Sequence, residues 1–210
     1  MSEPAADVAP TALPLFPLQM VLFPGAILGL KIFEARYLDL ISDCLRRVQP
    51  FGVVCLRAGS EASRARGQEL EAVGTLAHIE DVDAEQAGIL RVRCRGGQRF
   101  KLSGTPTQRE NGLWQASVAL QRADPVRTPG PAVLPTVTAL ADAIKKLKEQ
   151  DHTPFAPPFL LDDAGWVANR WCELLPISLA AKQKLMELDD PMIRLSLVDG
   201  YLRDKKVVVG

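Results

Sequence analysis

The sequence predicts an α+β fold in which a β-rich part comes first and a helical part follows. Three observations predict it. Prolines interrupt the apolar run at 13–37, so that no continuous helix can cross it. Segments between 51 and 120 are rich in β-branched residues or alternate apolar with polar residues, as strands do. After residue 124 apolar residues recur every three or four positions, the period of amphipathic helices.

The composition is that of a globular protein able to bury a core. The 210 residues suit one large domain or two small ones, since domains average roughly 150 residues. The formal net charge is zero, so the chain as a whole is not attracted to nucleic acid or to an anionic membrane. Binding of that kind would need a local patch of charge.

Cysteine use and the start of the chain favour a cytoplasmic location. The four cysteines lie far apart in apolar segments, which favours reduced core thiols over disulfides or a zinc site: Cys44, Cys55, Cys94 and Cys172. Residues 1–12 form a loose tail without the basic start and apolar centre of a signal peptide. No stretch approaches the ~20 apolar residues of a membrane span. We expect no cofactor, no metal and no membrane binding.

The segment 13–37 is expected to form the first hairpin of the β-rich part. Pro14, Pro17 and Pro24 each remove a backbone donor, and Gly25 marks the turn. The apolar pieces on both sides are rich enough in large side chains to be buried strands.

A helix is expected at 33–48, where an apolar stripe runs to Val48 and Pro50 ends it. Glu34 in the first turn and basic residues in the last suit the helix macrodipole. We interpret Glu34 and Arg36 as an ion pair that braces the hairpin against this helix.

Further strands are expected over four stretches, with a polar loop at 57–70 and an acidic turn at 83–88: 51–56, 73–82, 89–102 and 114–120. The third stretch is divided in two, at 89–95 and 98–102, by a turn at Gly96 and Gly97. Apolar residues face each other across this turn only if it holds three residues or a bulge, so a two-residue hairpin is disfavoured.

Residues 124–135 hold four prolines and are expected to link a β-rich part at 13–123 to a helical part at 136–210. Helices are expected near 137–147, 166–175, 179–188 and 191–202. Ser178 and Asp190 are typical N-caps for the last two.

A set of short motifs points to a known family. They are LPLFPL at 13–18, VLFPG at 21–25, IFEARY at 32–37, FGVV at 51–54, VGT at 73–75, QRF at 98–100, LLP at 174–176 and KQKLME at 182–187. In order and spacing they resemble the N-terminal, substrate-binding domain of the Lon protease family, from about residue 13 to about 202. The resemblance implies a PUA-like, twisted β-barrel followed by a helical bundle, and a module that recognises unfolded or damaged protein segments.

Catalytic parts are not expected. No GxxxxGK[ST] loop is present to hold phosphates, and the 210 residues leave no room for the ATPase and serine-lysine peptidase domains of the full-length protease. His78 and His152 have no partner at metal-ligand or triad spacing. Ser178 and Lys182 are spaced like a Ser-Lys pair, but capping is the preferred role for this serine.

Two surfaces are candidates for binding. Four apolar residues of the opening segment are candidates to line a groove for extended polypeptide, although each also suits the core: Phe16, Met20, Phe23 and Phe33. We expect an unfolded or degron-bearing polypeptide as partner, with a protease or chaperone as a further one.

The alternative is RNA or another anion, bound on a cationic strand face: Arg91, Arg93, Arg95, Arg99 and Lys101. This face equally suits plain solvation, with neutralisation by the acidic run Glu80, Asp81, Asp83 and Glu85. No aromatic residue alternates with these cations, so nucleic acid is the less favoured partner.

Overall fold

A computed structural model of the chain describes residues 12–57 and 69–208. Its strands are β1 (Ala12–Leu18), β2 (Ile27–Ile32), β3 (Phe51–Leu56), β4 (Leu70–Gln86), β5 (Ile89–Leu102), β6 (Thr107–Gln108) and β7 (Trp114–Leu120). Its helices are α1 (Ala35–Arg47), α3 (Leu134–Glu149), α4 (Ala164–Leu174), α5 (Leu179–Glu187) and α6 (Pro191–Asp204), with the 3-10 turn η1 (Pro131–Val133) before α3. The predicted α+β class is confirmed. Most of the predicted tail at 1–12 and of the predicted loop at 57–70 lies outside the described residues.

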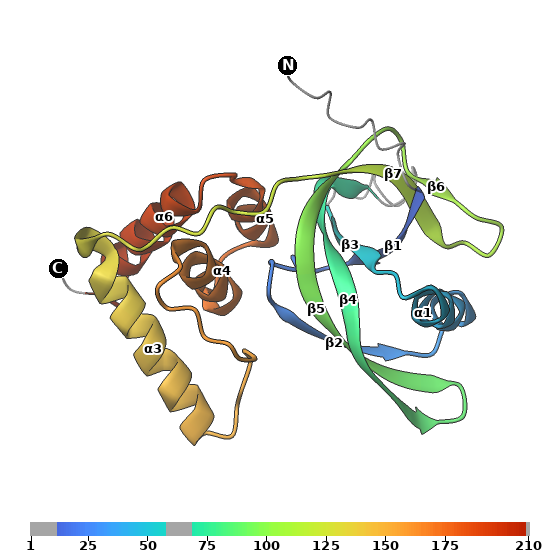
Figure 1. Ribbon diagram of the computed structural model, residues 1–210, viewed down its shortest axis with the longest axis horizontal. Helices are drawn as coiled ribbons and strands as arrows, with labels where there is room; N and C mark the ends of the chain where they lie inside the picture. The colour runs from blue at the N-terminus through green and yellow to red at the C-terminus, as the bar shows by residue number, and fades with distance from the viewer. Residues whose placement is uncertain (1–11, 58–68, 209–210) are drawn as a thin grey trace, which may run out of the picture.

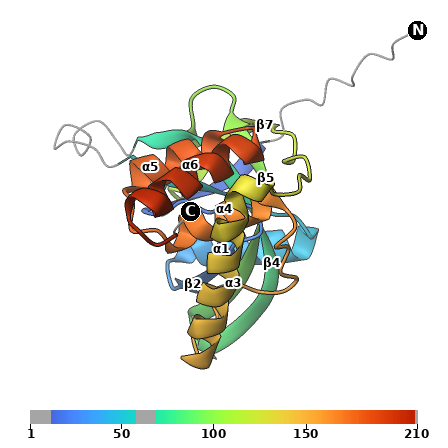
Figure 2. The ribbon, with the colours of Figure 1, turned by 90° about the vertical axis from the view of Figure 1, so that its left-hand side faces the viewer.

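The strands gather on one side of the molecule and the last four helices on the other (Figure 1). They form one sheet in the order β2-β5-β4-β3-β1-β7-β6, and β7 also pairs with the end of β5. Helix α1 lies beside the strands, away from α3 to α6. Seen from the helical side, α3, α5 and α6 stand in front of the strands (Figure 2).

The opening segment forms two strands, as predicted, but the predicted hairpin is wrong. Strand β1 runs parallel to β3 and antiparallel to β7, whereas β2 pairs with β5. The turn at Pro24 and Gly25 is held on β5 instead, because Gly25 N donates to Gly96 O (2.7 Å) and Gly96 N donates to Ala26 O (2.8 Å). These bonds direct β2 away from β1.

Strand β5 is continuous, so the predicted turn at Gly96 and Gly97 is also wrong. A Cβ on Gly96 would lie 2.3 Å from Phe23 O, and one on Gly97 would lie 2.5 Å from Nε2 of His78. These glycines therefore allow neighbouring segments to approach β5 closely, and they do not form a turn. Apolar side chains change from one side of β5 to the other because its register with β4 is irregular between Thr75 and Ala77. This irregularity is the bulge that was predicted as the alternative to a three-residue loop.

Helix α1 is shorter than the predicted 33–48, because it begins at Ala35 with Glu34 as its N-cap and ends at Arg47. Leu40, Ile41 and Cys44 of the predicted stripe are buried, but Val48 is 91% exposed. The helix stops at Arg47, and Val48 takes the left-handed conformation at φ 52°, which turns its side chain away from the stripe.

The C-terminal helices follow the predicted order and caps. Ser178 Oγ accepts a hydrogen bond from Ala181 N (3.2 Å), and an oxygen of Asp190 accepts one from Met192 N (2.7 Å). Both predicted N-caps are confirmed. Helix α3 begins at Leu134, inside the predicted linker.

One hydrophobic core continues from the strands into the helices, from Phe16 in β1 to Val208 after α6. The four cysteines are buried free thiols, as predicted. Burial raises the pKa of the Cys94 thiol to about 12. Within the described parts of the chain, no helix is long and apolar enough to cross a membrane.

Candidate functional site

A groove of about 280 Å³ lies where β1, the end of β2 and the start of α1 meet. We call it the Phe33 groove, and it is lined by Phe16, Pro17, Leu18, Lys31, Ile32, Phe33, Glu34, Arg36 and Tyr37. Its most prominent member is Phe33, which lies between β2 and α1 and is 65% exposed. Aromatic side chains are enriched at protein–protein interfaces, so an accessible ring beside a hollow makes this groove a candidate binding surface.

One wall of the groove is held rigidly. The rings of Phe16 and Tyr37 stack at 4.0 Å between centroids, and the Arg36 guanidinium lies 4.7 Å from the Tyr37 ring. The predicted Glu34–Arg36 ion pair is present at 2.7 Å, and Arg36 also donates to Gly112 O (3.2 Å). It braces α1 against the segment before β7 rather than against a hairpin. Burial raises the pKa of Tyr37, so the phenol stays neutral.

The four predicted apolar candidates do not lie together. Phe16 and Phe33 both line the Phe33 groove, although Phe16 shows only its edge at 8% exposure. Met20 is partly buried and packs against the core, and Phe23 is fully buried within it. The structure thus gives Phe23 a packing role and leaves Phe33 as the accessible ring.

The five predicted cations do not share one face. Arg91, Arg93 and Lys101 are exposed and Arg95 is partly so, but Arg99 is buried at 3% exposure. The bulge in β5 reverses the side on which Arg99 emerges, and its guanidinium enters the junction between strands and helices. The expectation of Arg99 on an open cationic face is corrected by this burial.

Glu80 neutralises part of that face, as the sequence suggested. It forms ion pairs with Arg93 (3.3 Å) and with Arg95. In register, Arg91 lies opposite Asp83 of β4. The side chain of Glu85, also in the predicted acidic run, lies outside the described residues. Carboxylates from the neighbouring strand therefore balance part of the cationic strip.

The residues considered for catalysis have structural roles or lie apart. Ser178 caps α5, whereas Lys182 Nζ donates to Glu173 O (3.1 Å), so each has its own partner. His78 on β4 and His152 after α3 are exposed on separate elements. Among the described residues, no group of three metal-ligating side chains could hold an ion.

A second hollow, of about 420 Å³, lies at the junction of strands and helices. Beside it Asp124 bridges Arg99 (2.8 Å) and Arg194 (2.5 Å), and Arg99 also donates to Met186 O and Leu188 O. Sequence reasoning missed this network because Asp124 resembled the first residue of a linker. An arginine within the apolar stripe of the last helix, Arg194, was the available signal.

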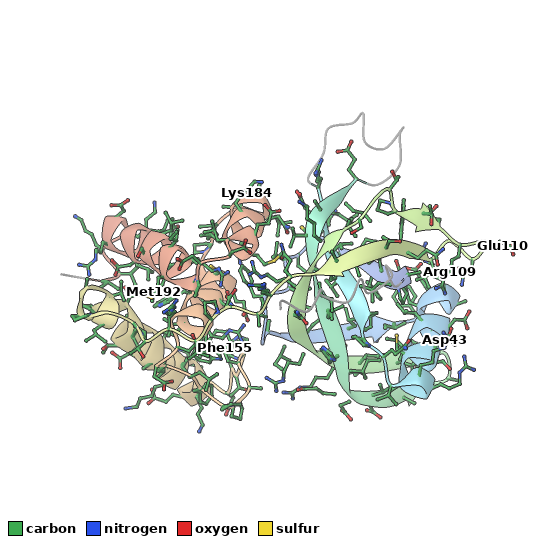
Figure 3. The ribbon with its side chains drawn as sticks, turned by 45° about the horizontal axis from the view of Figure 1, so that its top comes forward. Asp43, Arg109, Glu110, Phe155, Lys184 and Met192 are labelled. Atoms are coloured by element: carbon green, nitrogen blue, oxygen red, sulfur yellow. The ribbon has the colours of Figure 1, made fainter. Side chains whose placement is uncertain are left out.

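A second buried arginine fastens α4 to the turn before β2. Arg170 donates to Pro24 O (2.8 Å), and its guanidinium lies 5.6 Å from the rings of Phe155 and Trp166. Phe155 lies on the side of the helices that faces the strands (Figure 3). These contacts fix the junction but leave the Phe33 groove open to solvent on the far side of the strands.

The chain matches a family model described as the ATP-dependent protease La (LON) substrate-binding domain, over residues 12–204. Among curated proteins it is similar to Lon protease 2 of Myxococcus xanthus, 25% identical over 209 residues, and to Lon protease of Anaeromyxobacter dehalogenans (strain 2CP-C), 27% identical over 210. Each match covers 95% of this chain and 24% of the relative, so the chain spans about a quarter of their length.

Solved structures give the same result. A Lon N-terminal domain protein from Xanthomonas campestris is 36% identical, with a TM-score of 0.73 over 91% of this chain and 98% of that one. The N-terminal domain of the Mycobacterium avium complex Lon protease is 14% identical, with a TM-score of 0.59 over 92% of this chain and 99% of that one, and supports the fold alone.

Proposed function

Because this chain belongs to the family of the Lon substrate-binding domain, we propose that it is a non-enzymatic module that binds extended or unfolded polypeptide segments. A degron-bearing or damaged protein is the expected ligand, and a protease or chaperone that receives it is a further partner. The cytoplasmic location remains a prediction.

The observation that carries the proposal is the Phe33 groove. Burying a phenylalanine side chain fully contributes about 1.5–3 kcal/mol, so covering a ring that is 65% exposed contributes about 1–2 kcal/mol. That corresponds to about 5- to 30-fold in affinity. The rigid wall of Phe16, Tyr37 and Arg36 adds to this, because a wall that is already ordered loses little entropy when ligand binds.

The architecture that presents this groove is proposed to be a PUA-like twisted barrel joined to a helical part by the segment 124–135. In support, the strand pairings run from β5 through β4, β3, β1 and β7 and return to β5 at Phe100–Leu102. Such a ring of pairings leaves β2 and β6 outside it as additional strands.

Fluorescence anisotropy tests the proposal, with labelled peptides of about twelve residues selected on an array that tiles a chemically unfolded protein. Binding should survive moderate salt because burial of the exposed Phe33 ring does not depend on charge. Phe33→Ala should weaken it by about 5- to 30-fold. The matched control is Phe159→Ala, since Phe159 is also an exposed phenylalanine (47%) but contacts Trp166 in the helical part.

Peptide binding no greater than background would refute the function. Equal losses for the two variants would refute the groove as its location. The alternative, RNA or anion binding through Arg91 to Lys101, has less support since Arg99 is buried and Glu80 pairs with Arg93 and Arg95. It predicts an affinity that falls by about one log unit per log unit of salt for each phosphate contacted, which the same assay with a labelled oligonucleotide measures.

A further inference from the structure

We propose that the bound segment docks as an added β-strand on the open edge of β2, with one of its apolar side chains in the Phe33 groove. This inference rests on the proposed function and names its mode of binding. The expected occupant is an extended polypeptide whose side chains alternate between apolar and acidic.

Strand β2 stands at the end of the sheet. Its one strand partner among the described residues is β5, with Ile27 opposite Arg95 and Ile32 opposite Leu90. In Figure 1 it runs across the lower part of the sheet toward α1. An edge strand of this kind presents a row of backbone groups that another chain can pair with.

The direction of the open backbone groups follows from one hydrogen bond. Gly96 N donates to Ala26 O (2.8 Å), so the Ala26 carbonyl, just before β2, points toward β5. Backbone groups alternate sides along a strand, so those of Ile27 and Gly29 point the opposite way, toward the open edge. An incoming strand would find its donors and acceptors at these two residues.

The centre of the edge is also sterically open. Gly29 is exposed, and a Cβ placed on it would meet nothing within 4 Å. Leu30, beside it, is only partly buried and packs on the core, so it offers apolar surface to an inward-facing side chain of the added strand. Backbone pairing would provide the affinity common to many sequences, and the side-chain positions would provide the preference.

The edge leads directly into the Phe33 groove. Lys31 and Ile32 at the end of β2 line this groove together with Phe33. Phe33 lies four positions after Gly29, a distance of about 13 Å in a strand. The peptide residue that enters the groove should therefore lie about four positions from the one that pairs with Gly29.

Charge selects the side chains on the outer face. Arg93 lies opposite Gly29 in register, and it shares the single carboxylate of Glu80 with Arg95. Asp81 of β4 also lies opposite Arg93 in register, yet the Arg93 side chain is 50% exposed and stands beside a residue that has no side chain of its own. Acidic residues at the outward positions of the added strand would complement this arginine.

Two measurements on one peptide test the inference. The probe is the fluorescein-labelled peptide that binds best in the array described above. A series with a single N-methyl group moved along its backbone should lose about tenfold or more in affinity at every second position, because only alternate amides donate to β2. A version with lysine at the outward positions should bind less tightly.

On the protein, Gly29→Pro removes the outward N–H and leaves the ladder with β5 intact, so it should weaken binding about tenfold or more. The matched control is Gln108→Pro in β6, at the other end of the sheet. Since Arg109 N donates to Leu113 O on β7, the N–H of Gln108 points away from β7 and its loss should not alter binding. Circular dichroism confirms that both variants fold.

Uniform or absent effects of N-methylation would overturn the added strand while leaving the proposed function in place, and this part of the test needs no variant to fold. Absence of binding by every peptide would refute both. A dimer of the free protein that Gly29→Pro dissociates would show that a second copy of the chain, and not a foreign segment, occupies the edge.

Discussion

Replacing Asp124 by alanine should remove the acidic partner of the buried Arg194 and the nearer acidic partner of the buried Arg99, which also pairs with Asp189 at 3.4 Å. The Asp124 carboxylate lies 2.8 Å from Arg99 and 2.5 Å from Arg194, whose side chains are 3% and 1% exposed. Breaking a buried pair costs about 3–5 kcal/mol, because a charge without a partner remains in the interior. Here two like charges would also face each other. For a chain of this size the loss corresponds to a fall of about 6–20 °C in melting temperature.

Equilibrium unfolding in urea measures this effect, with Asp43→Ala as the control. Asp43 pairs with Arg46 on the outer side of α1, where the two side chains are 42% and 68% exposed, and Figure 3 shows it far from the helical part. An exposed pair contributes about 0–1 kcal/mol. A loss below about 1 kcal/mol for Asp124→Ala, or equal losses for the two variants, would refute the role assigned to the network.

Two further predictions concern stability. Burial raises the pKa of Glu173 from its ordinary value of 4.5 to about 7, so the folded protein keeps a proton that the unfolded chain releases between these pH values. As the pH rises from about 4.5 to about 7, the free energy of unfolding of the wild type should therefore fall on the order of 3 kcal/mol more than that of Glu173→Gln. Urea unfolding at each pH measures both proteins, and parallel profiles of unfolding free energy against pH would contradict this. Gly96→Ala should destabilise the protein by about 1–3 kcal/mol, because the new Cβ would lie 2.3 Å from Phe23 O. Gly200→Ala on α6, with open space around it, should stabilise the protein by up to about 1 kcal/mol. Thermal melts measure both effects, and equal shifts in melting temperature would refute the packing argument.

Local signals predicted elements better than their partners. Ser178 and Asp190 cap helices whose apolar period was already clear, and strand β7 has the predicted bounds. The pairing of strands was harder to predict, because a proline-glycine turn can join two strands that pair with each other or two strands that pair with different partners. Here Gly96, some seventy residues later in the chain, forms two backbone hydrogen bonds with the turn and so directs β2 to β5.

The candidate site was predicted only in part, because the burial of its residues depends on strand pairing as well as on local signals. Phe33 is the residue after a strand and before a helix, a position where a large ring has few neighbours to cover it, and it emerged as the exposed candidate. Phe23 is buried and its carbonyl lies close to Gly96 of β5, a contact that the sequence cannot show. Arg99 follows a bulge, and a change of one residue in register exchanges the two sides of a strand. The free edge of β2 could not be predicted because it depends on which strands remain unpaired.

The buried ionic junction also has a consequence for motion. Asp124 is the first residue of a proline-rich stretch that would ordinarily allow two halves to swing, yet it is anchored to β5 and to α6 at once. Arg170 adds a second anchorage at Pro24, directly upstream of β2. A chain captured along that strand would thus keep one orientation toward the four C-terminal helices, and any hand-over of it would require movement of the whole body instead of a bend within it.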